Sequence, residues 1–138
     1  MRIFIDTGGF IARYHSRDEH HNDAINYLRK IESGEAGIRK LYTSDYVIDE
    51  TITTIFARTS SFDVAKKCGE AIIRSKAIER LPVDEKVFGQ AWEFFKARGE
   101  IGLSFTDATS AVLMRKKGID AILGFDNHFA KLGLLMVP

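Results

Sequence analysis

The chain is poor in cysteine and has no long apolar run. Cys68 is its one cysteine, so no disulfide can form within the chain, and a reducing compartment is favoured. No apolar stretch has the length that spans a membrane, and the first residues show no signal-peptide pattern. We therefore expect a cytoplasmic protein that does not cross a membrane, with Cys68 as a small core residue.

A marked excess of charge of either sign is also missing. The 20 lysines and arginines nearly balance 19 acidic residues, for a net charge of +1. A broad basic surface is therefore excluded, and any site for a polyanion must be a local patch. With 45% hydrophobic residues among 138, the chain can form the core of one domain of ordinary size. We expect residues 1–138 to be that single domain.

Segments with two kinds of apolar pattern alternate along the chain. Short apolar runs typical of buried strands are followed by apolar residues at helical spacing. This alternation predicts right-handed crossovers and a central parallel sheet between two layers of helices, which is a three-layer α/β/α fold. We expect strands at residues 3–5, 41–44, 77–81, 121–123 and 134–137. We expect helices at residues 10–14, 24–32, 45–56, 62–75, 84–95, 104–117 and 127–132.

Two of these helices have apolar stripes that we expect to face the core. The stripe of the first consists of Ile48, Ile52, Ile55 and Phe56. The stripe of the second consists of Val87, Phe88, Ala91, Trp92 and Phe95. For the aromatic residues of the second stripe, a dimer surface is the less favoured alternative.

The first nine residues contain an acid at a strand end. Ile3–Ile5 reads as a buried strand, Asp6 follows it, and Thr7–Gly9 allows a sharp change of direction. In an open α/β sheet, the carboxyl ends of the strands form the edge where ligands bind. Asp is also a favoured N-cap, so Asp6 alone is explained equally well as the cap of the following helix.

A second informative stretch is residues 104–118. Ser104 occupies an N-cap position and Asp107 follows three residues later, as in a capping box. Arg115–Lys117 fills the last turn, where cations suit the helix dipole, and Gly118 ends the helix. These cations therefore have a structural explanation and are no evidence for RNA binding.

Four acids are expected at one edge of the sheet. Asp6 and Asp126 end strands, Asp107 opens one helix, and Glu50 lies near the beginning of another. Each acid alone is explained as a helix cap or a solvated side chain. The position of all four at one edge of the sheet is less easily explained in this way. Clustered carboxylates repel one another, and a divalent cation removes that conflict. Mg²⁺ or Mn²⁺ is the expected ion, because both prefer oxygen ligands.

Such a site suits phosphodiester hydrolysis. A metal ion polarises the phosphate and lowers the pKa of a bound water, and a second ion about 3.5–4 Å away can stabilise the leaving oxygen. Other chemistries lack their signatures: there is no Gly-x-Ser-x-Gly elbow, no Walker sequence, and no spaced His or Cys set for Zn²⁺. The adjacent His20 and His21 do not face each other on a helix, which favours solvated or substrate-facing side chains.

Four short pieces, in order along nearly the whole chain, together resemble the PIN domain family. Within that family the sequence is most similar to the toxin nucleases of the VapC type. The pieces are Asp6-Thr7, Ser44 followed by Asp49-Glu50, Ser104–Asp107 and Phe125–Phe129. The resemblance implies that four acids bind the metal, and these are Asp6, Glu50, Asp107 and Asp126. It implies that the hydroxyls of Thr7 and Thr106 orient an acid or a water.

The resemblance further implies an Mg²⁺- or Mn²⁺-dependent endoribonuclease, cutting single-stranded RNA or exposed RNA loops. It implies a small antitoxin as a protein partner and a homodimer. Two positions depart from the family pattern, because Gly8 and Gly124 stand where residues with hydroxyl or amide groups are common. Both weaken the expected support of the metal ligands.

The residues that contact RNA are less well defined. Arg13, His15 and Arg17 follow the first acid, and Arg58 lies beyond Glu50. Arginine suits bidentate contact with phosphate, so these are candidates for substrate binding. For each one taken singly, an ordinary solvated surface residue is the more common outcome.

Three alternatives remain open. The first is a catalytically idle PIN-like module that binds RNA or protein, supported by Gly8 and Gly124 alone. The second is a phosphatase with Asp6 as nucleophile, which normally needs an acid two residues later, where this chain has Gly8. The third is a receiver domain, whose phosphorylated aspartate and late lysine have no counterparts that we can place.

Overall fold

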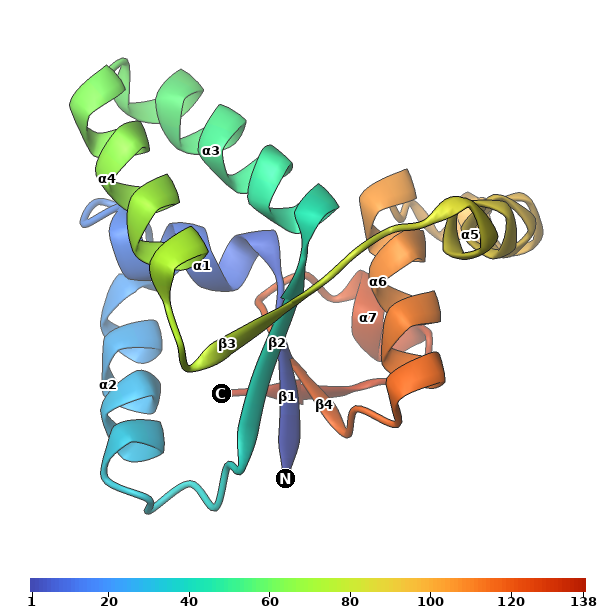
Figure 1. The fold of residues 1–138 in the computed structure, drawn as a ribbon, viewed down its shortest axis with the longest axis horizontal. Helices are drawn as coiled ribbons and strands as arrows, with labels where there is room; N and C mark the ends of the chain where they lie inside the picture. The colour runs from blue at the N-terminus through green and yellow to red at the C-terminus, as the bar shows by residue number, and fades with distance from the viewer.

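The computed structural model describes all residues from 1 to 138 and contains one five-stranded sheet (Figure 1). Every pairing is parallel, and the strand order is β3-β2-β1-β4-β5. Phe4 at the centre of the sheet pairs with Tyr42 on one side and Ile122 on the other. The strands are β1 (Arg2–Ile5), β2 (Lys40–Ser44), β3 (Ile78–Leu81), β4 (Ala121–Leu123) and β5 (Leu135–Val137).

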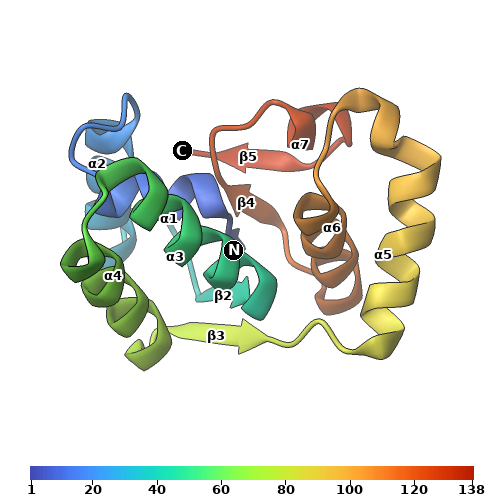
Figure 2. The ribbon, with the colours of Figure 1, turned by 90° about the horizontal axis from the view of Figure 1, so that it is seen from above.

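Helices cover both faces of the sheet, with α1 to α4 on one side and α5 and α6 on the other (Figure 2). The predicted three-layer α/β/α fold with a central parallel sheet is therefore confirmed. The helices are α1 (Thr7–Tyr14), α2 (His21–Glu32), α3 (Asp45–Thr59), α4 (Phe62–Arg74), α5 (Glu85–Arg98), α6 (Phe105–Lys117) and α7 (His128–Lys131). A 3₁₀ turn, Gly99–Ile101, lies between α5 and α6.

The core lies around the central strand. Ile3, Phe4 and Ile5 are buried, as are the three residues of β4. Strands in parallel sheets are covered on both faces, which is why residues 3–5 of β1 and all of β4 are apolar. The polar residues that follow β1 and β4 are therefore the first places along these strands where charged groups can gather.

The predicted apolar stripes are only partly correct. In α3 the buried residues include Val47, Ile48 and Ile55, whereas Phe56 is 46% exposed. In α5 only a narrow face is buried, because this helix packs against α6 outside the sheet. That face consists of Val87, Ala91 and Phe94.

Two aromatic residues of α5 that we expected in the core lie at the surface instead. Phe88 and Trp92 are each about half exposed. Their rings pack edge-on against Phe105, with ring centroids 5.1 Å and 6.5 Å apart. The prediction for Cys68 is confirmed: it is buried, and burial raises the pKa of its thiol to about 11. No helix is long and apolar enough to cross a membrane.

Candidate metal centre

Asp6 occupies the N-cap position of α1 without acting as a cap. Its backbone is extended, with φ −86° and ψ 166°, but its carboxylate makes no capping hydrogen bond. The side chain is 4% exposed, and Oδ1 has no hydrogen-bond partner. The alternative explanation of Asp6 as a helix cap is therefore wrong, and this carboxylate needs another reason to be buried.

The surroundings of Asp6 disfavour its charged form. Burial raises the pKa of this carboxyl to about 8, and the charges of Asp107 and Glu50 add to the rise. The backbone N–H groups of Thr7 and Gly8 face the carboxylate and oppose the rise only in part. A bound cation would reverse this balance.

Asp107 is fixed by the predicted capping box. The Ser104 N–H donates to Asp107 Oδ2 at 2.9 Å, and the Asp107 N–H donates to Ser104 Oγ at 3.0 Å. Asp107 is 7% exposed, and burial raises its pKa. The Ser104 hydrogen bonds lower that pKa, while the charges of Asp126 and Glu50 raise it further. The carboxylate is thus held in place among like charges.

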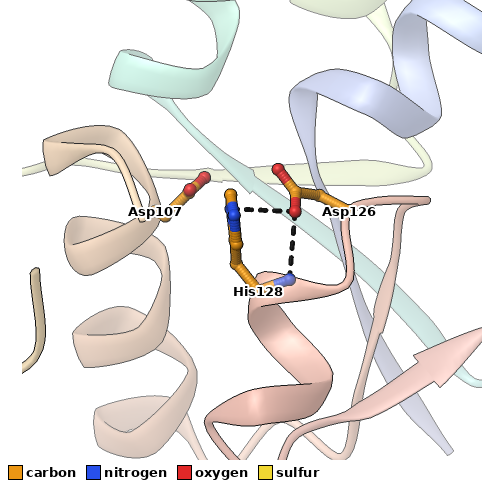
Figure 3. Close-up of side chains that lie close together, drawn as sticks. All are labelled: Asp107, Asp126 and His128. Atoms are coloured by element: carbon orange, nitrogen blue, oxygen red, sulfur yellow. Dashed lines mark hydrogen bonds and ion pairs between the residues drawn. The ribbon is translucent and has the colours of Figure 1, made fainter. Parts of the chain in front are cut away.

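Asp126 and His128 lie opposite Asp107 across a short gap (Figure 3). The His128 N–H donates to Asp126 Oδ1 at 3.0 Å, and His128 Nδ1 lies 2.8 Å from the same oxygen. One ligand atom each from Asp107, Asp126 and His128 lie within 4.8 Å of one another. These three residues form the only group in the chain with the spacing of a metal-ligand set.

The four expected acids lie near one another, but only two of them are close enough to belong to the three-residue group. Asp107 and Asp126 come together with His128, whereas Asp6 and Glu50 do not join this group. Glu50, half-buried in α3, is nevertheless near enough for its charge to raise the pKa of both Asp6 and Asp107. Asp107 is therefore the acid whose charge interacts with that of each of the other three acids.

Neither threonine hydroxyl forms a hydrogen bond with one of the four acids. Thr7 is buried, and its hydroxyl has no hydrogen-bond partner. Thr106 is half-buried, and its carbonyl accepts a hydrogen bond from the Thr109 hydroxyl at 2.6 Å. Orientation of a water by these hydroxyls stays a prediction.

The donor set suits a divalent cation. No lysine or arginine forms an ion pair with Asp6, Glu50, Asp107 or Asp126. Buried carboxylates without such partners are costly, and the unpartnered Asp6 Oδ1 is a buried lone-pair donor. Carboxylate oxygens are the ligands that Mg²⁺ and Mn²⁺ prefer. The residues present therefore fit the expected ion.

The two departures from the family pattern both border Asp6. A Cβ atom on Gly124 would lie 3.3 Å from Asp6 Cβ and 3.5 Å from Oδ2. A Cβ atom on Gly8 would lie 3.7 Å from the Phe125 nitrogen and 4.0 Å from Asp6 Oδ2. The absent side chains leave room beside this carboxylate.

An open groove of about 590 Å³ runs beside Asp126 and His128. Arg58 and Lys131 line it, and so does Asp18, which lies 3.5 Å from Arg58 as an ion pair. Of the other predicted substrate contacts, Arg13 lines a separate cavity that contains none of the four acids. His15 and Arg17 do not line the groove either.

His20 and His21, although adjacent in the chain, make different contacts. His20 lines the groove and stacks on Phe125, with ring centroids 4.2 Å apart and an angle of 3° between the rings. His21 Nδ1 lies 2.6 Å from the carbonyl oxygen of Ala12 and ties α2 to α1. The two rings therefore lie in different surroundings.

His128 is the residue of this centre that the sequence analysis did not assign. It was part of the motif Phe125–Phe129 but received no role. The available signal is its position two residues after Asp126, at the start of α7. Its approach to Asp107 brings the start of α7 near the start of α6, which local spacing does not reveal.

Comparison with protein families agrees with this geometry. The PIN domain model matches residues 3–135. The chain belongs to the PIN domain family. A VapC ribonuclease of Archaeoglobus fulgidus is 30% identical over 131 residues, which cover 94% of this PIN domain chain and 80% of that protein.

VapC20 of Mycobacterium tuberculosis, named a 23S rRNA-specific endonuclease, is 30% identical over 142 residues and covers 98% of this PIN domain chain. Its crystal structure, described as that of a sarcin-ricin loop cleaving toxin, superposes with a TM-score of 0.81 over 96% of each chain. VapBC2 of Rickettsia felis, solved with a promoter DNA fragment, has a TM-score of 0.67 at 14% identity, which is a likeness of fold.

Proposed function

We propose that this PIN domain is an Mg²⁺- or Mn²⁺-dependent endoribonuclease with residues 1–138 as one nuclease domain. The observation that supports this most strongly is the gathering around Asp107 of acids that have no lysine or arginine partner, with one oxygen of the buried Asp6 lacking any hydrogen-bond partner. The two curated relatives are ribonucleases by name, which supports RNA as the substrate. Asp6, Glu50, Asp107 and Asp126 are the proposed metal ligands.

The four acids of the site have different proposed roles. Asp6 and Asp107, both buried, supply rigid ligands, because the turn after β1 and the capping box limit their movement. Glu50 and the more exposed Asp126 complete the negative charge around the ion. The bound ion supplies charge stabilisation at the phosphate and a water of lowered pKa. Water held near the acids by the hydroxyls of Thr7 and Thr106 is part of this proposal.

The groove beside Asp126 is the proposed path of the RNA strand. Arg58 and Lys131 provide cations for phosphate oxygens. The stacked rings of His20 and Phe125 add an aromatic face, on which an unpaired base can stack. A path with a single aromatic pair and two cations suits a single-stranded segment or an exposed loop.

A toxin of a toxin–antitoxin pair is the proposed biological role. The similarity to VapC20, a toxin by the description of its structure, supports it. We further propose a small antitoxin as partner, a homodimer, and a cytoplasmic location, in keeping with the single buried thiol of Cys68. The idle binding module is supported by Gly8 and Gly124 alone, and the presence of all four acids argues against it.

The test is cleavage of an RNA pool and of a sarcin-ricin loop hairpin with Mg²⁺ or Mn²⁺. An EDTA sample and the variant Asp6→Asn are compared with the wild type. Asp63→Asn is the matched control, because Asp63 is an exposed acid of α4 that only pairs with Lys67. We expect metal-dependent cutting by the wild type and Asp63→Asn and none by Asp6→Asn.

Full cutting by Asp6→Asn would refute the site. RNA binding without cutting, by a wild type shown to hold metal, would instead favour the binding module. Cutting that persists in EDTA would refute metal dependence while leaving the nuclease intact.

A further inference from the structure

His128 is a ring nitrogen among carboxylates. It lies between Asp107 and Asp126 in Figure 3, and all three offer ligand atoms within 4.8 Å of one another. Atoms bound at about 2.1 Å to one ion lie within roughly 4.2 Å of each other, so small side-chain rotations bring the three onto a shared ion.

Nδ1 is the ring nitrogen beside Asp126. It lies 2.8 Å from Asp126 Oδ1, but it forms no hydrogen bond with that oxygen or with any other group. Two atoms bound at about 2.1 Å to one ion and at right angles lie roughly 3 Å apart, which is close to this spacing. Nδ1 is therefore a buried nitrogen without a hydrogen-bond partner, next to a carboxylate oxygen.

The other ring nitrogen, Nε2, faces the loop that leads to Ser104 and Asp107. A Cβ atom on Gly102 in this loop would lie 3.1 Å from Nε2. Gly102 has φ +90°, a conformation that favours glycine, and the lack of a side chain lets this backbone approach the ring closely. The side chain of His128 is 30% exposed, which leaves an approach for an ion.

We propose that His128 Nδ1 is a nitrogen ligand of an ion shared with Asp107 and Asp126, and that this site selects Mn²⁺ over Mg²⁺. Imidazole suits transition ions, whereas Mg²⁺ prefers oxygen alone. Asp6 and Glu50 lie outside the three-residue group and supply oxygen only, so they add nothing to this selectivity. The inference rests on the metal site of the proposed nuclease and names the donor that sets its ion preference.

The experiment measures metal binding directly. Pulsed electron paramagnetic resonance of the protein with one equivalent of Mn²⁺ detects ¹⁴N coupled to the ion. Calorimetry gives the Mn²⁺ and Mg²⁺ affinities of the wild type, His128→Ala and His128→Asn, each checked for fold by circular dichroism. His15→Asn is the control histidine, because α1 separates His15 from Asp6 by about 12 Å.

We expect ¹⁴N coupling in the wild type and in His15→Asn and its loss in both His128 variants. The Mn²⁺ affinity should fall at least about tenfold in His128→Ala, while the Mg²⁺ affinity changes less than about threefold. Both variants keep the backbone N–H that donates to Asp126, so they test the loss of the ring while that hydrogen bond still holds the acid.

Wild-type protein with bound Mn²⁺ but without ¹⁴N coupling would overturn the proposal. Equal losses of Mn²⁺ and Mg²⁺ affinity would also overturn it, because His128 would then only position Asp126. RNA cleavage by the same samples is scored separately. Cutting without ¹⁴N coupling refutes the ligand alone, and coupling without cutting refutes the nuclease alone.

Discussion

Gly124 lies directly against Asp6, and a Cβ atom at position 124 would come within 3.3 Å of Asp6 Cβ. From the family pattern we expected Gly124 to represent lost support for the metal ligands. The structure shows that this position also borders the most buried acid of the site. Its lack of a side chain therefore decides how much room the Asp6 carboxylate has.

Substitution of Gly124 by Ala should move Asp6 by a few tenths of an ångström. We expect metal-dependent RNA cleavage to fall roughly tenfold, since small misplacements of catalytic groups are costly. The free energy of unfolding should fall by about 1 kcal/mol from overpacking. Gly89→Ala is the control, because Gly89 lies in α5 with nothing within 4 Å, and it should stabilise the protein by about 0.5–1 kcal/mol. Unchanged cleavage in Gly124→Ala would show that the site tolerates the contact.

The raised pKa of Asp6 predicts how stability depends on pH without metal. The folded-state pKa is about 8, against 3.8 for an unperturbed Asp. Between these values the folded state keeps a proton that the unfolded state has released. The free energy of unfolding should therefore decrease as the pH rises from about 4 to 8, by up to about 1.4 kcal/mol per pH unit from this group.

Comparison with Asp6→Asn isolates this effect, because Asn is neutral at every pH. Denaturant unfolding in EDTA should show the variant more stable than the wild type at pH 8, with the difference shrinking toward pH 4. Mn²⁺ at pH 8 should stabilise the wild type and have a much smaller effect on the variant. A constant difference between the two proteins across this range would mean that Asp6 is ionised without metal.

Ser104 links the stability of α6 to the position of Asp107. Ser104→Ala removes the hydroxyl that accepts from the Asp107 N–H, at a cost of about 1 kcal/mol, or a melting temperature lower by roughly 3–5 °C. We also expect a several-fold loss of Mn²⁺ affinity, because the first turn of α6 holds the carboxylate. Thermal melts and calorimetry check the two effects.

Ser61→Ala is the matched control for this prediction. The Ser61 hydroxyl caps α4 by accepting from the Val64 N–H at 3.2 Å, far from the acids in the chain order. It should lower the melting temperature by a similar amount and leave Mn²⁺ affinity unchanged. Equal losses of affinity in both variants would point to general destabilisation.

Local spacing was enough to predict part of this molecule. The alternation of patterns gave the parallel three-layer fold, and the three-residue spacing of Ser104 and Asp107 gave the capping box. Both predictions depend only on residues that are close to one another in the sequence. The strand order depends on which faces pack together, and no single segment contains that information.

The features that were missed or wrong depend on tertiary contacts. His128 comes near Asp107 only because the chain folds so that the start of α7 lies near the start of α6, so nothing within residues 125–129 indicates this approach. The exposed Phe56 and Trp92 belong to apolar stripes wider than the surface that covers them. A stripe indicates which face of a helix is apolar, but the partner helix decides how much of it is buried.

Arg58 provides the last prediction, which concerns RNA binding. It is 52% exposed, lines the groove beside Asp126, and is held by Asp18 at 3.5 Å. Arg58→Ala should raise KM for a cleavable RNA about three- to tenfold with kcat within about twofold, because phosphate contacts position the strand without taking part in the chemistry. The loss of one contact should also reduce the salt dependence of binding, by about 0.7 in the slope of log K against log salt concentration.

Arg13→Ala is the control, because Arg13 lines the cavity that contains none of the four acids. It should leave KM and the salt slope unchanged. If Arg13→Ala raises KM and Arg58→Ala does not, then the RNA follows the cavity beside α1 and α2, and the groove beside Asp126 is not its path. If both variants raise KM, the strand extends from the acids across both surfaces, and a longer RNA should bind more tightly than a short one.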